Sequence, residues 1–284
     1  MTTPDTPSAG PGPAEKKSRA GRDLPAAVAS AVVLLALIAA SLYFWKPAFL
    51  IVVAAAILVG IWEFKQGFAA KDIRLPVEPL MVGAVVMLVG AYVGGAPALV
   101  TALAVTALAT MMWRLRRGVD GFVRDATAAV FTAVYVPLLA GFVALLLAED
   151  EGALGVLTFI LVTIASDIGG YAVGVLAGRH PMAPVISPKK SWEGFAGSTV
   201  LCVVVGWATV VYLLEGAWWV GVLLGLITVV MATMGDLCES VIKRDLGIKD
   251  MSSIIPGHGG LMDRLDSLLA TVAPTWLLLH YLVF

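Results

Sequence analysis

Long apolar runs follow one another through most of the chain, and they constrain its fold more than any other feature of the sequence. A helix of about 20 apolar residues crosses a hydrocarbon layer of about 30 Å. Runs of this length, or nearly so, occur at 25–45, 48–63, 77–94, 97–113, 127–147, 154–175, 195–214, 217–235 and 267–284. Because a helix satisfies its own backbone hydrogen bonds in lipid, these runs predict an all-α, polytopic integral membrane protein with about nine transmembrane helices.

The composition agrees with a membrane protein and excludes an ordinary soluble domain. Hydrophobic residues make up 60% of the chain and charged residues 14%, with a mean hydropathy of +0.93. In soluble domains charged residues account for about 25%. Cys202 and Cys238 form no CxxC pair, so the sequence indicates neither a zinc site nor a disulfide framework. The net charge of −1 identifies no partner, and we expect a lipid bilayer around the chain and no nucleic acid.

Residues 1–23 differ from the rest of the chain, because they are rich in Thr, Pro, Ser, Ala and Gly and end in a basic cluster. Such a segment buries too little apolar surface to fold, so we expect a disordered cytosolic tail. The apolar stretch that follows is too long for a signal-peptide core and lacks a small-residue cleavage site, which favours a retained first span. No internal repeat or Gly/Ser linker divides residues 24–284, so we expect a single membrane-embedded domain.

The positions of Lys and Arg predict the orientation of the chain in the membrane. With a cytosolic N-terminus and the spans above, every Lys and Arg except Lys46 falls on the cytosolic side. The acidic residues 149–151 and Glu215 fall on the opposite side. This distribution follows the positive-inside rule. We therefore expect a multi-pass protein of the cell (plasma or inner) membrane, with its C-terminus on the far side and its polar motifs facing the cytosol.

The stretch 240–266 concentrates ionisable side chains in a chain that is otherwise mostly hydrocarbon. If the segment that leads into it is helical, the i, i+3, i+4 and i+7 positions of one face are Asp236, Glu239, Ser240 and Lys243. Asp263 and Asp266 are likewise three residues apart. The glycines of 256–260 permit positive φ, so that backbone N–H groups there can point at an anion. Paired carboxylates, cations and a Gly-rich loop suit a Mg²⁺ ion that holds phosphates.

A second polar block lies upstream, on a loop that we expect to precede a helix. Lys189 and Lys190, together with the hydroxyl groups of Ser187 and Ser191, have the chemistry to bind a triphosphate. The alternative interpretation is the ordinary positive charge of a cytosolic loop.

Asp167 lies within an apolar run, where a carboxylate is costly. We expect it to face a polar cavity or a cation, with a structural hydrogen-bonding role as the alternative. Beside it Gly170, Gly174 and Gly178 recur every four residues, which favours the close approach of another helix.

Together the three blocks resemble the signature of phosphatidate cytidylyltransferases (CDP-diacylglycerol synthases). The matching positions in the last block are Ser240, Lys243, Arg244, Lys249, Asp250, Ser252, Pro256, His258, Gly259, Gly260, Asp263, Arg264 and Asp266. Blocks 186–194 and 166–174 are similar to the same family, with Ser191 where members often carry Thr. The specific motifs cover the chain from residue 166 onward, and before that only the general hydrophobicity agrees.

The resemblance implies an enzyme of phospholipid biosynthesis that transfers a cytidylyl group from CTP to phosphatidate, giving CDP-diacylglycerol and pyrophosphate. The phosphate that attacks is already anionic, so the catalyst must chiefly hold two anions together and neutralise charge. Mg²⁺ is expected, either as two ions or as one ion assisted by cations. Residues 24–284 would then form the catalytic domain.

The resemblance also assigns roles to individual residues. The expected metal ligands are Asp167, Asp236, Asp263 and Asp266. The expected nucleotide-binding residues are Ser187, Lys189, Lys190, Ser191, Lys249, Gly259 and Gly260. The expected catalytic residues are Asp263, Asp266, Lys243, Arg264 and His258, with His258 contacting phosphate or shaping the loop.

Two other functions remain open from the sequence. A CTP-dependent kinase of a lipid alcohol, such as a polyprenol, would also need a metal and a triphosphate site. A membrane transporter would use Asp167 as a coupling site, but the charges gather at one face and the spans lack paired, broken-helix symmetry. The sequence leaves a homodimer, the acyl-chain preference and the choice between CTP and dCTP undecided.

Overall fold

The structure is a computed structural model that describes residue 33 and residues 36–254 and 259–284. Its helices are α2 (Lys46–Ala69), α3 (Val77–Leu115), α4 (Phe122–Ala133), the π-helix η1 (Val134–Leu138), α5 (Leu139–Ala148), α6 (Gly152–Ala177), α7 (Trp192–Tyr212), α8 (Trp218–Leu246) and α9 (Met262–Leu282). Two short strands, β1 (Pro181–Ala183) and β2 (Ser187–Ser191), lie between α6 and α7. The predicted tail 1–23 lies outside the described residues, and so does part of the predicted span 25–45, of which 36–44 is helical.

In the described residues, 7 helical segments are long and apolar enough to cross a membrane. In this count α3 is one segment, and the continuous run of α4, η1 and α5 is one segment. They agree with the predicted class, a helical integral membrane protein. The number of nine spans and the cytosolic N-terminus remain predictions.

The helix α3 turns back on itself at Gly95. The φ of 69° and ψ of −164° at Gly95 leave the helical region, and Pro97 follows. A Cβ on Gly83 would lie 2.2 Å from Oγ1 of Thr106. In a straight helix with a rise of about 1.5 Å per residue, these two residues would be about 35 Å apart. The two arms of α3 therefore run in opposite directions, and the turn coincides with the predicted boundary between the runs 77–94 and 97–113.

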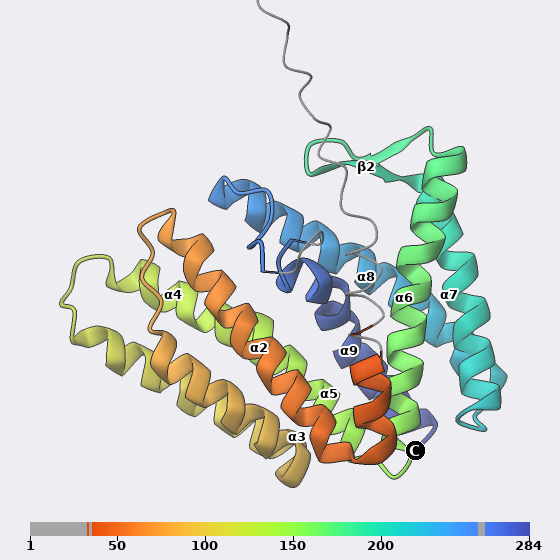
Figure 1. Cartoon of the computed structure of the whole chain (residues 1–284), viewed down its shortest axis with the longest axis horizontal. Helices are drawn as coiled ribbons and strands as arrows, with labels where there is room; N and C mark the ends of the chain where they lie inside the picture. Colours follow the sequence, from red (N-terminus) through yellow and green to blue (C-terminus); the bar gives the residue numbers. More distant parts are fainter. Residues whose placement is uncertain (1–32, 34–35, 255–258) are drawn as a thin grey trace, which may run out of the picture.

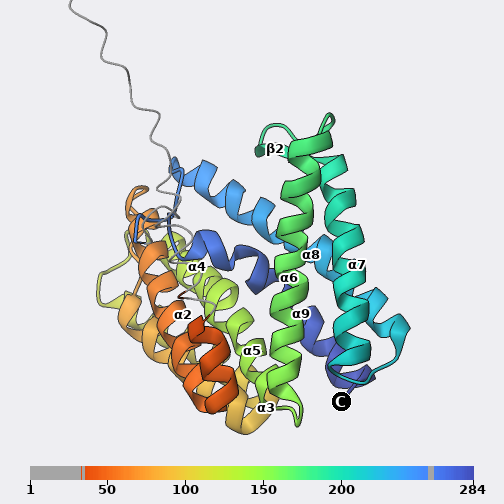
Figure 2. The same ribbon diagram turned by 45° about the vertical axis from the view of Figure 1, so that its right-hand side comes forward.

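The helices form two groups that are joined by α9. Helices α2, α3 and α5 lie on one side of the molecule and α6 and α7 on the other, while α8 runs from α7 across to the side of α2 (Figures 1 and 2). Between them, α9 packs against α5, α6 and α8. The N-terminal half of α9 is thus surrounded by both groups, and this half carries the predicted catalytic carboxylates.

Small residues bring α6 and α7 close together, as the sequence predicted. A Cβ on Gly170 would lie 2.7 Å from Oγ of Ser198, and one on Gly178 would lie 2.9 Å from Oγ of Ser191. Gly174 also faces α7. The expected close approach along this glycine stripe is therefore confirmed.

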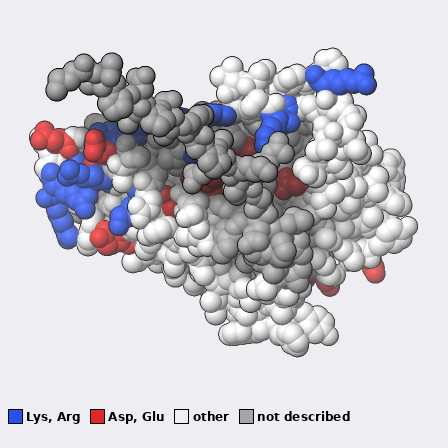
Figure 3. Space-filling model, turned by 45° about the horizontal axis from the view of Figure 1, so that its top comes forward, with Lys and Arg blue, Asp and Glu red and all other residues white. Residues whose placement is uncertain are grey.

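Charged residues gather toward one end of the molecule. The C-terminal ends of α2 and α8 and the β1–β2 hairpin lie toward the top of Figure 1, whereas the C-terminus of the chain lies at the bottom. On the face shown in Figure 3, Lys and Arg follow the upper and left edges, whereas the described surface toward the bottom is mostly white, with Asp or Glu at its lower right. Both α8 and α9 reach further into the charged end than predicted, because α8 continues past 235 to Leu246 and α9 begins at Met262 rather than 267.

The hairpin corrects the prediction that residues 189–191 form a loop. Strand β2 pairs with β1 in an antiparallel manner, with Pro181 opposite Ser191 and Ala183 opposite Ser187. The described residues are therefore mainly helical, which is compatible with the predicted all-α class, and they include this short hairpin.

A buried ion pair joins α3 to α4. Nε of Arg114 lies 2.7 Å from Oδ2 of Asp125, and the two side chains are 3% and 1% exposed. The same guanidinium donates to the carbonyl oxygens of Gly118 and Asp120 in the connecting turn. These contacts compensate the burial of the charge and hold the turn between the two helices.

Candidate active site

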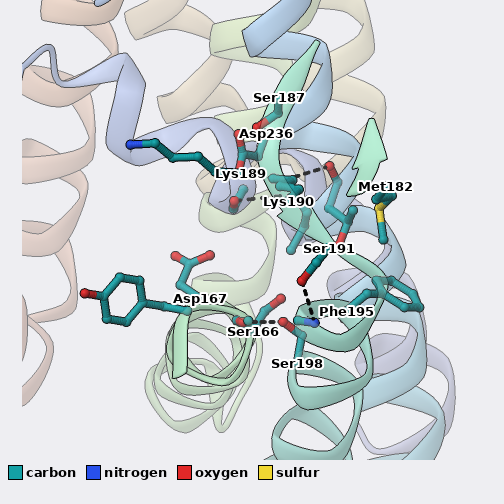
Figure 4. Close-up of a pocket in the computed structure, with 16 residues that line it drawn as sticks. Ser166, Asp167, Met182, Ser187, Lys189, Lys190, Ser191, Phe195, Ser198 and Asp236 are labelled. Carbon is teal, nitrogen blue, oxygen red and sulfur yellow. Dashed lines mark hydrogen bonds and ion pairs between the residues drawn. The ribbon is translucent and has the colours of Figure 1, made fainter. Parts of the chain in front are cut away.

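A polar cavity of about 310 Å³ lies between α6, α7 and α8 at the charged end of the molecule. The β1–β2 hairpin and the start of α9 complete its wall. Figure 4 shows the side chains that line it. Its charged and hydroxyl-bearing lining residues are Ser166, Asp167, Tyr171, Ser187, Lys189, Lys190, Ser191, Ser198, Thr233, Asp236 and Ser267. The structure thus brings together the blocks around residues 167 and 187–191 with Asp236, as the sequence predicted.

An ion pair connects β2 to α8 across this cavity. Nζ of Lys190 lies 2.6 Å from Oδ2 of Asp236, with the side chains 23% and 38% exposed. Nζ of Lys190 also lies 3.5 Å from the carbonyl oxygen of Thr233. Further along α8, Nε of Arg244 donates to the carbonyl oxygen of Ile186 at 3.3 Å. The hairpin is therefore held over α8 at two points, and Lys190 is directed into the cavity rather than into solvent.

Ser191 is the N-cap of α7, a role that sequence reasoning missed. Its Oγ accepts a hydrogen bond of 3.1 Å from the N–H of Gly194, which satisfies one of the unpaired donors at the helix start. The side chain also lines the cavity. Glu193 follows in the first turn, where its carboxylate accepts from the N–H groups of Arg179 and His180. The helix start is thus fixed at the cavity wall, where the partial positive charge of the helix dipole suits an anion.

Asp167 lines the cavity from α6, as expected for a carboxylate within an apolar run. Charged side chains that act on it electrostatically include Asp236, Asp266, Lys190 and Arg264. On the next helix, Oγ of Ser198 donates to the carbonyl oxygen of Ser166 at 2.6 Å. This bond holds α7 against the turn of α6 that carries Asp167.

Next to the cavity, Lys243 joins carboxylates of α8 and α9. Its Nζ lies 2.6 Å from Oδ1 of Asp263 and 3.0 Å from Oε2 of Glu239. The Glu239 side chain is fully buried, and its Oε1 has no hydrogen-bond partner among the described residues. Sequence reasoning placed Glu239 on the polar face of this helix but gave it no role in the site. Its separation of i+4 from Lys243 was the signal for the contact.

Asp266 is buried, and its Oδ1 accepts a hydrogen bond of 2.7 Å from the N–H of Ser267. It lies close enough to Glu239 for the two carboxylates to act on each other electrostatically. Gly235 permits this arrangement, because a Cβ there would lie 2.6 Å from the carbonyl oxygen of Asp266. The lack of a side chain at Gly235 therefore lets the acidic faces of α8 and α9 meet.

The donor atoms present suit Mg²⁺. Carboxylate oxygens are hard ligands, and the buried Oε1 of Glu239 has no hydrogen-bond partner in the described structure. In the described part of the chain, no three His, Cys, Asp or Glu side chains are grouped so as to hold a metal ion by themselves. A Mg²⁺ ion that arrives with a nucleotide needs only one or two carboxylates, since phosphate oxygens and water supply the other ligands.

Between α8 and α9, described residues on both sides of 255–258 donate to Asp263. Oδ2 of Asp263 accepts from the N–H of Met251 at 3.0 Å and from the N–H of Gly260 at 2.8 Å. The φ of Gly259 is +85°, which confirms the positive φ expected of this glycine-rich segment. The predicted role of His258 lies outside the described residues. Lys249 is exposed on this loop, outside the set of residues that lines the cavity.

Arg264 and Glu63 complete the surroundings of α9. Arg264 is exposed in the first turn of the helix. Glu63 of α2 is fully buried, and it accepts hydrogen bonds from the N–H groups of Leu261 and Met262. Sequence reasoning missed Glu63, although an acidic residue at the end of the apolar run 48–63 was a signal.

Fold and site together define a polytopic membrane protein with a polar site at one end, in which cations and carboxylates surround a cavity large enough for phosphate groups. A model of the cytidylyltransferase family matches residues 25–282, well beyond the region from residue 166 that carried the recognisable motifs. The chain belongs to this family.

Relatives with assigned names agree with this membership. The phosphatidate cytidylyltransferase of Mycobacterium bovis is 41% identical over 283 residues, which cover 95% of this chain and 92% of that protein. The phosphatidate cytidylyltransferase of Mycobacterium leprae is 41% identical over 284 residues, covering 93% of this chain and 90% of that protein. The phosphatidate cytidylyltransferase of Haemophilus influenzae is 29% identical over 275 residues, covering 86% of this chain and 94% of that protein.

Proposed function

We propose that this protein transfers the cytidylyl group of CTP to phosphatidate and releases pyrophosphate. The observation that carries the proposal is the cavity at the charged end of the membrane-spanning helices, which Lys189, Lys190, Asp167 and Asp236 line and across which Lys190 pairs with Asp236. The names of the mycobacterial relatives support the choice of substrates. We further propose that this end faces the cytosol, with the N-terminus on the same side.

In this reaction an oxygen of the phosphatidate phosphate attacks the α-phosphorus of CTP. A new P–O bond forms, the bond to the β-phosphate oxygen breaks, and pyrophosphate leaves with its electron pair. The nucleophile is anionic at neutral pH, so no base has to remove a proton from it. The main barrier is the approach of two anions, and positive charge at fixed positions lowers it.

The cations of the site have positions that suit this task. Lys190 extends from β2 into the cavity, and Lys189 is exposed at its rim. Both would neutralise the triphosphate, and the N-terminus of α7 adds backbone N–H groups. Lys243 is held by Asp263 and Glu239, so its charge is fixed in place on α8, about two helical turns beyond Asp236 of the cavity wall. A preorganised charge of this kind stabilises the transition state more than a mobile surface lysine does.

Mg²⁺ is the proposed cofactor, as one ion or two, and when bound it would neutralise phosphate charge and align the reacting oxygens. The proposed ligands are Asp236, Asp263 and Asp266, with Asp167 as a further one. Because no three of the described carboxylates are grouped around one point, each ion would take one or two of them and complete its shell with phosphate oxygens and water. Glu239 joins this proposal because its buried Oε1 lacks a hydrogen-bond partner in the described structure.

The lipid substrate would keep its acyl chains in the bilayer. Withdrawing two chains from lipid costs about 0.8 kcal/mol per CH₂ group, which no cavity of about 310 Å³ could recover. We therefore propose that phosphatidate enters laterally, with its phosphate at the cavity and its chains among the lipid-facing helices.

The test is an assay of the purified protein in lipid vesicles with CTP labelled in either the α- or the γ-phosphate. We expect α-label to enter the lipid fraction when phosphatidate is supplied, while γ-label is released as pyrophosphate. A lipid-alcohol kinase would instead transfer γ-label to an alcohol acceptor, and that result would refute the proposal.

A further inference from the structure

A carboxylate of α2, far from the motifs in sequence, holds the start of α9. Glu63 is 0% exposed, and both of its carboxylate oxygens accept hydrogen bonds from residues at or near the start of α9. Oε1 accepts a hydrogen bond of 2.8 Å from the N–H of Leu261 and another from the hydroxyl group of Ser252. Oε2 accepts a hydrogen bond of 2.7 Å from the N–H of Met262. A buried carboxylate is tolerated when it is paired in this way, and its partners are thereby fixed.

The start of α9 needs such a partner because its own sequence supplies none. The first N–H groups of a helix have no acceptor within the helix. The N-cap position of α9 is Leu261, whose side chain has no polar atom to accept from them. Glu63 takes the place of a local cap, and its negative charge lies at the positive end of the helix dipole.

Glu63 and Asp263 accept hydrogen bonds from adjacent residues of the segment between α8 and α9. Met251 and Gly260 donate to Asp263, whereas their chain neighbours Ser252 and Leu261 donate to Glu63. The two carboxylates therefore hold residues 251–252 next to residues 260–261. Since the other oxygen of Asp263 accepts from Lys243, the position of Glu63 is linked through the loop to the charged centre of the site.

The packing of α2 is adapted to this contact. Gly60, Glu63 and Gly67 lie on one face of the helix, at i, i+3 and i+7. A Cβ on Gly60 would lie 2.7 Å from Sδ of Met262, and one on Gly67 would lie 3.1 Å from Cδ1 of Leu246. The two glycines let α2 approach the start of α9 and the end of α8 closely enough for Glu63 to reach the backbone.

We propose that Glu63 is a positioning residue for the transfer reaction, which holds Asp263 and Asp266 at the distance from Lys243 that the reaction requires. This inference rests on the proposed cytidylyl transfer. Glu63 touches the backbone of α9 rather than substrate, so its loss should disturb the geometry of catalysis more than the affinity for CTP. A misplacement of about 1 Å at a reacting group lowers a rate by about 10²-fold.

The test compares Glu63→Gln, Glu63→Asp and the control Glu78→Gln in the full-length protein in vesicles. A Gln side chain has nearly the same size, but its NH₂ group would face a backbone N–H at one of the two positions where Glu63 accepts. Glu78 is an exposed acidic residue at the start of α3 and provides the matched control. The measurements are kcat, KM for CTP and for phosphatidate, and amide hydrogen exchange of the segment 259–266.

We expect Glu63→Gln to lower kcat by about 10²-fold, with KM for CTP near the wild-type value and faster exchange at Leu261 and Met262. Glu63→Asp should recover part of kcat, because it keeps the carboxylate, and Glu78→Gln should behave as wild type. An unchanged kcat per folded molecule in Glu63→Gln would overturn the inference, even if the variant were less stable.

A second variant keeps the test decisive if Glu63→Gln fails to fold. Ser252→Ala removes one of the three donors to Glu63, so we expect a smaller fall in kcat together with faster exchange in the segment 259–266. Unchanged kcat and exchange in Ser252→Ala would then overturn the inference. Failure of the proposed function is distinguishable, because it would appear as absent transfer in the wild-type protein.

Discussion

Replacing Lys190 by Met removes one positive charge from the cavity and keeps a side chain of similar length. Nζ of Lys190 lies 2.6 Å from Oδ2 of Asp236, and the side chains are 23% and 38% exposed. An ion pair that reaches solvent to this extent contributes about 0–1 kcal/mol to stability. Loss of a preorganised electrostatic contact at a reacting group costs about 2.7–4 kcal/mol of transition-state stabilisation, or about 10²–10³ in rate. We therefore expect Lys190→Met to lose activity with little change in Tm.

The assay follows α-label from CTP into phosphatidate in vesicles, while thermal unfolding is measured on the same preparation. Lys71→Met is the matched control, because Lys71 is exposed beyond the end of α2 and lies outside the cavity. A value of kcat/KM for CTP within a few-fold of wild type in Lys190→Met, with the control unaffected, would refute the assignment of Lys190 to the triphosphate.

A double-mutant cycle with Asp236→Asn separates two roles of the pair. If Lys190 and Asp236 serve only to hold β2 over α8, the double variant should lose no more activity than the worse single variant. If the lysine binds phosphate and the carboxylate binds metal, the two losses should multiply, and this is the result we expect.

Three further predictions follow from the structure. Asp125→Asn leaves the buried Arg114 without its charged partner, so the free energy of unfolding should fall by about 3–5 kcal/mol, as measured by denaturant titration. Substitution of Asn for Asp236, Asp263 or Asp266 should each lower turnover by about 10²–10³ and alter the Mg²⁺ dependence; normal turnover with unchanged Mg²⁺ dependence in all three would refute the metal assignment. Cysteine labelling should place the two chain termini on opposite sides of the membrane, and labelling of both from one side would mean that a span was wrongly assigned.

Hydropathy predicted the helices well because lipid allows few alternatives. The runs 48–63, 154–175 and 195–214 correspond to α2, α6 and α7, and even the reversal within α3 was indicated by a Gly and Pro pair. In a bilayer every backbone group must be bonded within the segment, so length and apolar character nearly determine the structure. The same argument fails where the chain leaves the lipid.

The ends of the helices were harder to predict, because hydropathy does not show whether a charged side chain contacts lipid or another polar group of the protein. The predicted span ended at 235, yet α8 continues through Glu239 and Lys243 to Leu246. Those charged side chains face Asp263 on α9 rather than lipid, so the helix has no reason to stop at them. The three-residue and five-residue strands of the hairpin were likewise missed, because segments so short carry no detectable alternation of polar and apolar residues.

The sequence predicted the types of side chain in the candidate site but not the contacts that hold them in position. Spacing placed Asp236 and Lys243 on one helical face, and the structure confirms that face. The N-cap at Ser191 is a local contact with Gly194, and a Ser directly before the predicted helix was a signal for it. The contacts of Glu63 instead depend on tertiary neighbours, which no local pattern in the sequence encodes. Glu63 lies 198 residues before Leu261, to which it is bonded. A single sequence gives no means of pairing two such positions.

The distribution of charge around α8 and α9 supports the proposal that substrate binding completes the site. Lys243 contacts both Glu239 and Asp263, so one positive charge is shared by two carboxylates, and Asp266 lies beside them. Negative groups brought this close repel one another in a medium of low dielectric constant. Gly235 nevertheless allows the two helices to meet at this point, where a larger residue would have kept them apart. We propose that a cation arriving with the nucleotide would offset this repulsion, and the Mg²⁺ dependence of turnover tests that proposal.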